Sequence, residues 1–252
     1  MRSELETIRN YLLSTLRRDT KNKLSLELKV DFFLSSLAAA PSLHSIKKIE
    51  LWFKQARKKS GLKIKIIPIK QLESWAQEEK TGNIRHASGR FFSVVGIRVR
   101  SERREVKGWS QPIINQPEVG ILGFLVKKIG GVYHFLVQAR EEPGNIDKVQ
   151  LSTTLMATRS NFTRVHGGKA PLYLDYFLGK KKGKVLVKKV QSEEGARFYK
   201  KGNLNMVVEI HPNAEREVPE DFKWLTLYQI KTLMQRENVV NAAARSVISC
   251  LP

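Results

Sequence analysis

The segment VGILGFLVKKIGGVYHFLVQA, residues 119–139, predicts a β-hairpin. Two apolar runs, 119–129 and 132–139, flank the pair Gly130 and Gly131. Glycine readily adopts the positive φ angles that a two-residue turn between antiparallel strands requires, so a Gly-Gly pair in this position favours a tight turn. The hairpin is therefore the clearest part of the β-sheet that the sequence predicts.

Regular elements are predicted on both sides of this hairpin. Ser3 and Glu6 have the spacing of a capping box at the start of an amphipathic helix. A second helix is expected over residues 23–40, where Pro41 ends it, and a third over residues 46–61. Further strands are predicted at 63–67, 91–99, 185–190 and 206–210, and further helices at 69–76, from the capping pair Thr226 and Gln229, and at 239–251.

This order of elements indicates the fold class. Strands that alternate with irregular polar segments and a few helices are typical of an α+β domain with a mixed sheet. A chain of 252 residues, 41% of them hydrophobic, is long enough for one large domain with a helical extension. The predicted organisation is an N-terminal helical extension over residues 1–60 and an α+β domain over residues 61–252.

The composition restricts the classes of partner and the setting. The net charge of +21 favours polyanionic partners, namely nucleic acid, an acidic membrane surface or phosphorylated small molecules, and does not choose among them. No apolar run is long enough to span a bilayer. With Cys250 as its one cysteine the chain forms no internal disulfide, which fits a reducing, cytoplasmic setting. The five histidines are scattered, and no zinc-ligand set is expected.

Four polar segments carry side chains suited to chemistry: 86–92, 138–145, 157–168 and 191–198. Several follow predicted strands, where binding groups commonly lie. Their Arg, Asn, Gln, Ser and Thr side chains are donors suited to a pyrophosphate and a pyrimidine ring. Glu142, Glu193 and His86 are candidate acids and bases.

Taken together, eight ordered stretches carry a family resemblance. They are IRHASGRFF (84–92), GILGF (120–124), FLVQAREEPGN (135–145), ATRSNFTRVHGG (157–168), LDYF (174–177), QSEEGARF (191–198), WLTLYQIKTL (224–233) and SVISCLP (246–252). They resemble the NDP-hexose 2,3-dehydratases of deoxysugar pathways, which act in making the sugars of macrolide and glycopeptide antibiotics. The resemblance covers roughly residues 51–252.

The resemblance implies a fold and a partner. Members of the family consist of two tandem copies of a repeat related to the Nudix hydrolases, and this chain matches one copy. We therefore expect a Nudix-like mixed β-sheet flanked by helices. A single copy would expose the apolar face on which the second copy packs, so a homodimer is expected. The Nudix catalytic box is absent, so Mg²⁺-dependent pyrophosphate cleavage is not expected.

The resemblance also implies a reaction. The family substrate is a TDP-linked 4-keto-6-deoxyglucose. Loss of the C3 hydrogen beside the C4 ketone gives an enolate, and the C2 hydroxyl leaves as water, which yields a 3,4-diketo-2,6-dideoxy sugar. No hydride moves, so no cofactor is expected, and the sequence has no Gly-rich dinucleotide fingerprint.

Residue roles follow as hypotheses. Glu142 or Glu193 is the expected base, with His86 third. The expected ketone donors are Arg90, Asn161 or Arg164, and the expected pyrophosphate ligands are Arg140, Arg159 and Arg197. Trp109 or Phe162 is expected to stack on thymine, and Gln111, Gln138, Asn145 and Gln150 are expected to bind its edge.

Two alternatives remain open at this level. One is a non-catalytic nucleotide- or nucleic-acid-binding protein of the same fold, although no recognition-helix or RNA-binding aromatic motif supports it. The other is a different lyase or epimerase that forms the same enolate. The sequence departs from the family pattern at Thr153, Met156, Gly202, Leu204 and Ala243.

Overall fold

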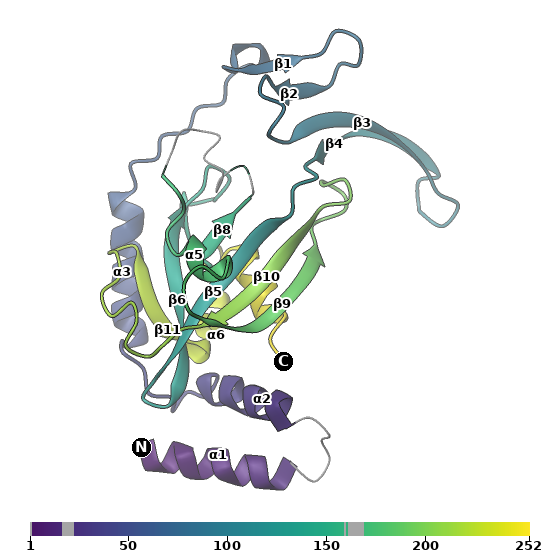
Figure 1. Cartoon of the computed structure of the whole chain (residues 1–252). Helices are drawn as coiled ribbons and strands as arrows, with labels where there is room; N and C mark the ends of the chain where they lie inside the picture. Colours follow the sequence, from purple (N-terminus) through teal and green to yellow (C-terminus); the bar gives the residue numbers. More distant parts are fainter. Residues whose placement is uncertain (1, 17–22, 159, 161–168) are drawn as a thin grey trace.

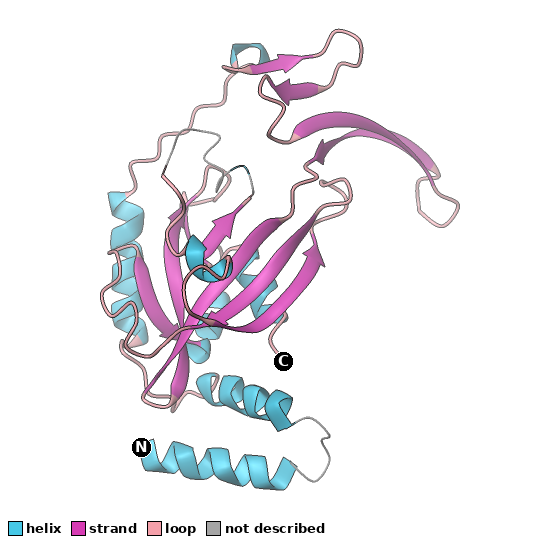
Figure 2. Cartoon of the chain, viewed as in Figure 1, coloured by secondary structure: helices cyan, strands magenta, loops and turns pink. Residues whose placement is uncertain are grey.

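The computed structural model describes residues 2–16, 23–158, 160 and 169–252, and it has the predicted α+β architecture (Figures 1 and 2). Seven strands form the larger sheet in the described part of the chain, and four strands form a smaller one. The smaller sheet lies at one end of the molecule, and α1 and α2 lie at the other (Figure 1). The helices are α1 (Arg2–Leu16), α2 (Lys23–Ser35), α3 (Ile46–Lys59), α5 (Leu174–Phe177), α6 (Leu227–Met234) and α7 (Ala242–Ser249). The smaller sheet contains β1 (Trp75–Gln77), β2 (Ile84–His86), β3 (Ser93–Arg100) and β4 (Gly108–Asn115).

The predicted hairpin is confirmed at the centre of the larger sheet. β5 (Gly120–Ile129) and β6 (Val132–Glu141) pair antiparallel on either side of Gly130 and Gly131, whose φ angles are 60° and 88°. The strand order is β11-β6-β5-β10-β9, with β7 paired to β6 and β8 paired to β5. The remaining strands are β7 (Val149–Ser152), β8 (Leu155–Ala157), β9 (Lys184–Ser192), β10 (Gly202–Glu209) and β11 (Phe222–Thr226). Because β10 runs parallel to β5 while β6 and β9 run antiparallel to their neighbours, the sheet is mixed, as predicted.

Apolar side chains cover both faces of the larger sheet. Successive side chains of a strand point to opposite faces, and Phe124 and Leu125 accordingly belong to different core clusters. The cluster of Phe124 also includes Ile49 and Phe53 from α3. The cluster of Leu125 includes Phe177 from α5. The central strands are therefore buried on both sides.

The N-terminal helices form a smaller core of their own. Leu5 and Leu13 from α1 pack with Leu26 and Val30 from α2. Asp31, which is buried, accepts hydrogen bonds from Arg9 at 2.7 Å and from Lys128 at 2.6 Å, and so ties this core to β5. α3 belongs to the main core and not to this smaller one. The predicted domain boundary at residue 60 stays a prediction.

Two predicted elements between α3 and the hairpin are wrong. The segment 63–67 is not a strand, because it has no neighbouring strand to pair with and Ile66 is 96% exposed. Residues 69–76 form only a single 3₁₀ turn, η2 (Ile69–Gln71), and then enter β1. Ser74, just before β1, has a φ of 61°, and the next residue, Trp75, pairs with His86.

Helix ends also differ from the predictions. α2 stops at Ser35 instead of residue 40, and α7 begins at Ala242 instead of residue 239. The chain before α7 is extended because Leu151 of β7 donates to the carbonyl of Val239 and accepts from the N–H of Asn241. The predicted capping box of α6 is confirmed, with Thr226 and Gln229 each bonded to the other's backbone N–H.

Candidate active site

A cavity of about 790 Å³ opens at one edge of the larger sheet, where strands begin and end, and not along an outer strand. β5 and β10 begin at this edge and β6 and β9 end at it, because the first two strands are parallel to each other and antiparallel to the others. The first turn of α7 and the chain that follows β4 complete the walls. Segments far apart in the sequence therefore meet around one cavity, which we call the sheet-edge cavity.

Five of the predicted site residues line the sheet-edge cavity. They come from the end of β6 and the loop after it, from β7, and from the residue after β9. They are Arg140, Glu142, Asn145, Gln150 and Glu193. Both predicted carboxylate bases therefore lie in the same cavity as a predicted pyrophosphate ligand.

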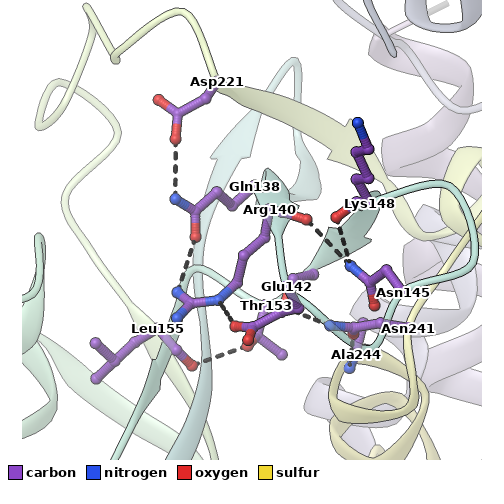
Figure 3. Close-up of polar contacts among 11 residues, drawn as sticks. Gln138, Arg140, Glu142, Asn145, Lys148, Thr153, Leu155, Asp221, Asn241 and Ala244 are labelled. Carbon is purple, nitrogen blue, oxygen red and sulfur yellow. Dashed lines mark hydrogen bonds and ion pairs between the residues drawn. The ribbon is translucent and has the colours of Figure 1, made fainter. Parts of the chain in front are cut away.

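Arg140 and Glu142 form a close ion pair. The Arg140 Nε donates to the Glu142 Oε1 at 2.6 Å (Figure 3). Each of the two side chains is 30% exposed. The amide of Asn145 donates to the backbone carbonyls of Arg140 and Lys148, at 3.4 and 3.1 Å (Figure 3). Asn145 therefore braces the loop that carries Glu142.

Glu193 is held by a residue of β10. Asn203, at the start of β10, donates from its side-chain amide to the Glu193 Oε1. The oxygen of the same amide accepts the backbone N–H of Gly120 at 3.1 Å. A Cβ at position 120 would lie 2.8 Å from that oxygen, so glycine permits this close approach. The carboxylate is thus anchored to the first residue of β5.

A buried lysine lies in the same wall. Lys201 is 6% exposed, and its ammonium donates to the backbone carbonyl of Glu118. Burial lowers the pKa of Lys201, and the charges of Glu193 and Glu118 oppose this shift. With Arg140 and Arg245, Lys201 brings positive charge to a cavity that also contains two carboxylates.

Part of the wall is apolar. Phe92, Ile114 and Phe198 line it, and the first two come from the smaller sheet or its border. Ile114 donates to the carbonyl of Arg197 at 2.9 Å and accepts from the N–H of Tyr199 at 2.8 Å. These bonds tie β4 to the loop between β9 and β10, so that loop and β4 together hold the apolar wall.

Other predicted site residues lie away from the sheet-edge cavity. His86 packs its ring against Trp75 and Phe91, and its Nδ1 lies 2.8 Å from the Ser88 Oγ. Arg90 is exposed, and its backbone N–H donates to the same hydroxyl. Neither His86 nor Arg90 lines the cavity that contains the two carboxylates.

Trp109, Gln111, Arg197 and Gln138 also do not line this cavity. Trp109 donates to Gln111 at 2.6 Å, and Gln111 donates to the carbonyl of Ala196 at 2.9 Å. Arg197 is exposed and pairs with Glu194 at 3.3 Å. Gln138 lines a second cavity on the far side of Arg140. The remaining predicted residues, Arg159, Asn161, Phe162 and Arg164, lie outside the described part of the chain.

Several lining residues escaped the sequence analysis. Lys201, Asn203, Asn241, Arg245 and Ser246 all face the sheet-edge cavity. One signal for Asn203 was available, because asparagine is depleted in strands and the start of β10 reads GNLN. Asn241 is the N-cap of α7, and its side chain accepts from the N–H of Ala244 at 2.9 Å.

The described residues contain no group of three or more His, Cys, Asp and Glu side chains placed to hold a metal ion. None of their helices has the length and apolar character needed to cross a membrane.

Comparison with known proteins points to one family. The family model of the NDP-hexose 2,3-dehydratases, which describes the sequences of that family, matches residues 46–251 of this chain. A dTDP-4-dehydro-6-deoxy-α-D-glucopyranose 2,3-dehydratase of Saccharopolyspora spinosa is 45% identical over 223 residues, which are 88% of this chain and 45% of that protein. Proteins of the same name from Amycolatopsis orientalis and Streptomyces violaceoruber are 43% and 42% identical over 81% and 80% of this chain, and 44% and 45% of their own lengths. The chain thus spans less than half the length of these relatives.

Proposed function

We propose that this chain, which belongs to the NDP-hexose 2,3-dehydratase family, removes water across C2 and C3 of a TDP-linked 4-keto-6-deoxyglucose. The observation that carries the proposal is the joint placement of Glu142 and Glu193, with three cationic side chains, around one cavity. The substrate class comes from the names of the relatives.

The reaction needs a base, an acid and charge stabilisation. One carboxylate, Glu142 or Glu193, takes the proton from C3 of the sugar, and the electron pair moves to the C4 oxygen as an enolate. The C2 hydroxyl then leaves, and the acid form of a carboxyl group supplies the proton that makes it water. The resulting enol converts to a 3,4-diketo-2,6-dideoxy sugar. No hydride is transferred in these steps.

The positive side chains have two tasks in this scheme. Arg140, Lys201 and Arg245 offer N–H donors to the diphosphate and to the developing C4 oxyanion. Guanidinium groups bind such oxygens in a bidentate manner, whereas an ammonium acts as a compact charge. Stabilisation of an oxyanion by one preorganised donor is worth about 10²–10³ in rate.

The apolar wall gives the nucleobase a place. Phe92 and Phe198 offer aromatic faces, and stacking of a base on such a face contributes about 1–3 kcal/mol. We propose that they take the stacking role that the sequence assigned to Trp109 or Phe162, with Gln150 available at the edge of the ring. Trp109 is already bonded to Gln111 elsewhere.

A second unit of the same kind is the partner we propose, as a homodimer. The edge strand β9 carries exposed Val185 and Val190, which are 49% and 64% accessible. Exposed apolar edges are typical sites of association. Sedimentation at micromolar concentration is expected to show a dimer, and a monomer alone would contradict this assignment.

The free, buried thiol of Cys250 agrees with the predicted cytoplasmic setting, which stays a prediction.

The experiment is incubation with TDP-4-keto-6-deoxyglucose, with mass spectrometry for loss of water and a 3-ketoreductase to trap the product. Glu142→Gln and Glu193→Gln are compared with Glu194→Gln, whose side chain is 60% exposed and pairs with Arg197. Loss of the base is expected to lower the rate by about 10²–10⁴, while Glu194→Gln keeps it. If Glu142→Gln and Glu193→Gln both retain the wild-type rate, the base assignment is wrong.

A binding measurement separates this proposal from a nucleic-acid-binding protein. TDP is expected to raise the unfolding temperature, because a ligand of the folded state stabilises it. Binding to duplex DNA is expected to be weak and to fall steeply with salt. Tight DNA binding without a response to TDP would favour the other class.

A further inference from the structure

A line of side chains joins the sheet-edge cavity to a second cavity. The second cavity, of about 780 Å³, lies between α3, β6 and β11, and Arg140 lines both. From it, the Asp221 Oδ2 accepts the Gln138 Nε2 at 2.9 Å, and the Gln138 Oε1 accepts the Arg140 Nη1 at 3.4 Å (Figure 3). The line ends at Glu142, which Arg140 contacts at 2.6 Å.

Asp221 decides which way the amide of Gln138 points. An ionised carboxylate only accepts hydrogen bonds, so the NH₂ end of the amide must face Asp221. The carbonyl end is then left for Arg140. The reverse orientation would set two acceptors against each other at Asp221 and two donors against each other at Arg140.

Gln138 and Glu142 together hold the guanidinium of Arg140. Its Nη1 bonds to the first and its Nε to the second, so two separate N–H groups of one planar fork are engaged. Two such bonds restrict the rotation of the plane, and the remaining donors stay available in the sheet-edge cavity. An arginine bonded only to Glu142 would keep more rotamer freedom.

The base of this line is rigid. Gln138 pairs with Phe222 across β6 and β11, and the backbone N–H of Ala139 donates to the carbonyl of Asp221 at 2.7 Å. Asp221 therefore enters β11 at a place that the sheet itself determines. Groups carried on a sheet hold a site more precisely than groups on loops.

We infer that Asp221 and Gln138 are positioning residues, which orient Arg140 and, through it, Glu142. This inference rests on the proposed function for its effect on turnover. It departs from the expectation that Gln138 binds the base of the nucleotide. It is tested without catalysis as well, because Arg140 is expected to contact the diphosphate of any bound nucleotide.

The variants are Asp221→Ala, Asp221→Asn and Gln138→Leu, with Glu220→Ala as the matched control. Glu220 is the neighbouring carboxylate, 82% exposed and paired with Lys59 at 2.8 Å. Asp221→Ala and Gln138→Leu are each expected to lower kcat and TDP affinity about tenfold, the scale of a lost hydrogen bond to a charged group. Asp221→Asn keeps one oxygen acceptor for Gln138, so its kcat and TDP affinity are expected to fall less than those of Asp221→Ala. Glu220→Ala is expected to change either quantity less than twofold.

A mutant cycle separates positioning from a general loss of structure. In a Gln138→Leu background, Asp221→Ala is expected to have no further effect on TDP affinity, because the link is already broken. A merely structural role would leave the two effects additive. Additive effects on TDP affinity would overturn the inference. So would an Asp221→Ala protein with the same kcat and TDP affinity as Glu220→Ala. If the wild-type chain binds TDP but releases no water, the proposed function fails, and the cycle in TDP affinity still decides the inference.

Discussion

Asn203 holds the carboxylate of Glu193 across the turn between β9 and β10. Its side-chain amide donates to Glu193, and the amide oxygen accepts the backbone N–H of Gly120 at 3.1 Å. One amide thus links a proposed acid–base group to the central strand of the sheet. The bond also shows that the position of Glu193 depends on the parallel pairing of β10 with β5, which sets Asn203 opposite Gly120.

The first prediction concerns this amide. Asn203→Asp keeps an acceptor for the N–H of Gly120 but has no donor for Glu193. We expect kcat/KM to fall about tenfold or more, the scale of a hydrogen bond to a charged group. The unfolding temperature should change little. Asn10→Asp, at an exposed site on α1, is the control, and wild-type turnover by Asn203→Asp would show that this bond does not position Glu193 for catalysis.

The second prediction concerns Lys201. Lys201→Met removes a buried charge from the cavity wall while preserving the length of the side chain, so calorimetry is expected to show TDP affinity reduced about tenfold. Lys200→Met is the matched control, because Lys200 is exposed and lies over the ring of Tyr199. Equal affinities for the two variants would remove Lys201 from the diphosphate site.

The third prediction concerns packing beneath the sheet. A Cβ at Gly123 would lie 2.1 Å from the ring of Phe177, which is 6% exposed and has little room to move. Gly123→Ala is therefore expected to lower the free energy of unfolding by about 1–3 kcal/mol. Gly96→Ala, on β3, meets nothing within 4 Å and should be close to neutral. Urea unfolding monitored by circular dichroism compares them, and a stable Gly123→Ala protein would show that the ring can shift.

The fourth prediction concerns His134, which is fully buried. Its Nδ1 lies 3.1 Å from the carbonyl of Val132, and burial lowers its pKa from 6.5 to about 4. Between these values the unfolded chain binds a proton at His134 and the folded chain does not. The free energy of unfolding should therefore fall as the pH drops through this window, by up to about 1.4 kcal/mol per pH unit.

His134→Asn tests that slope, because asparagine can still donate to Val132 but does not titrate. The free energy of unfolding is measured for both proteins from pH 7 to pH 4. It should fall more steeply for the wild type than for His134→Asn as the pH drops. His211→Asn, at an exposed site, provides the comparison. A difference that is constant with pH would mean that His134 titrates alike in both states.

Local patterns were sufficient for much of the fold. The Gly130-Gly131 turn and the capping pair of Thr226 and Gln229 form as predicted, because both depend on residues adjacent in sequence. The short segment 63–67 was mistaken for a strand, because alternation alone does not supply a pairing partner. The short strands β7, β8 and β11 were missed for the converse reason, since pairing with β5 or β6 defines them.

By itself, the sequence determined the family, the α+β class and the polar segments from which Arg140, Glu142 and Glu193 come. Only the tertiary structure decided which of those segments meet. His86 and Trp109 belong to the smaller sheet and do not line the cavity, whereas Asn203 and Lys201 enter it through β10 and the turn before it. The physical reason is that strand order depends on pairing between distant segments. Gly120 and Asn203 are 83 residues apart, and no local pattern encodes their contact.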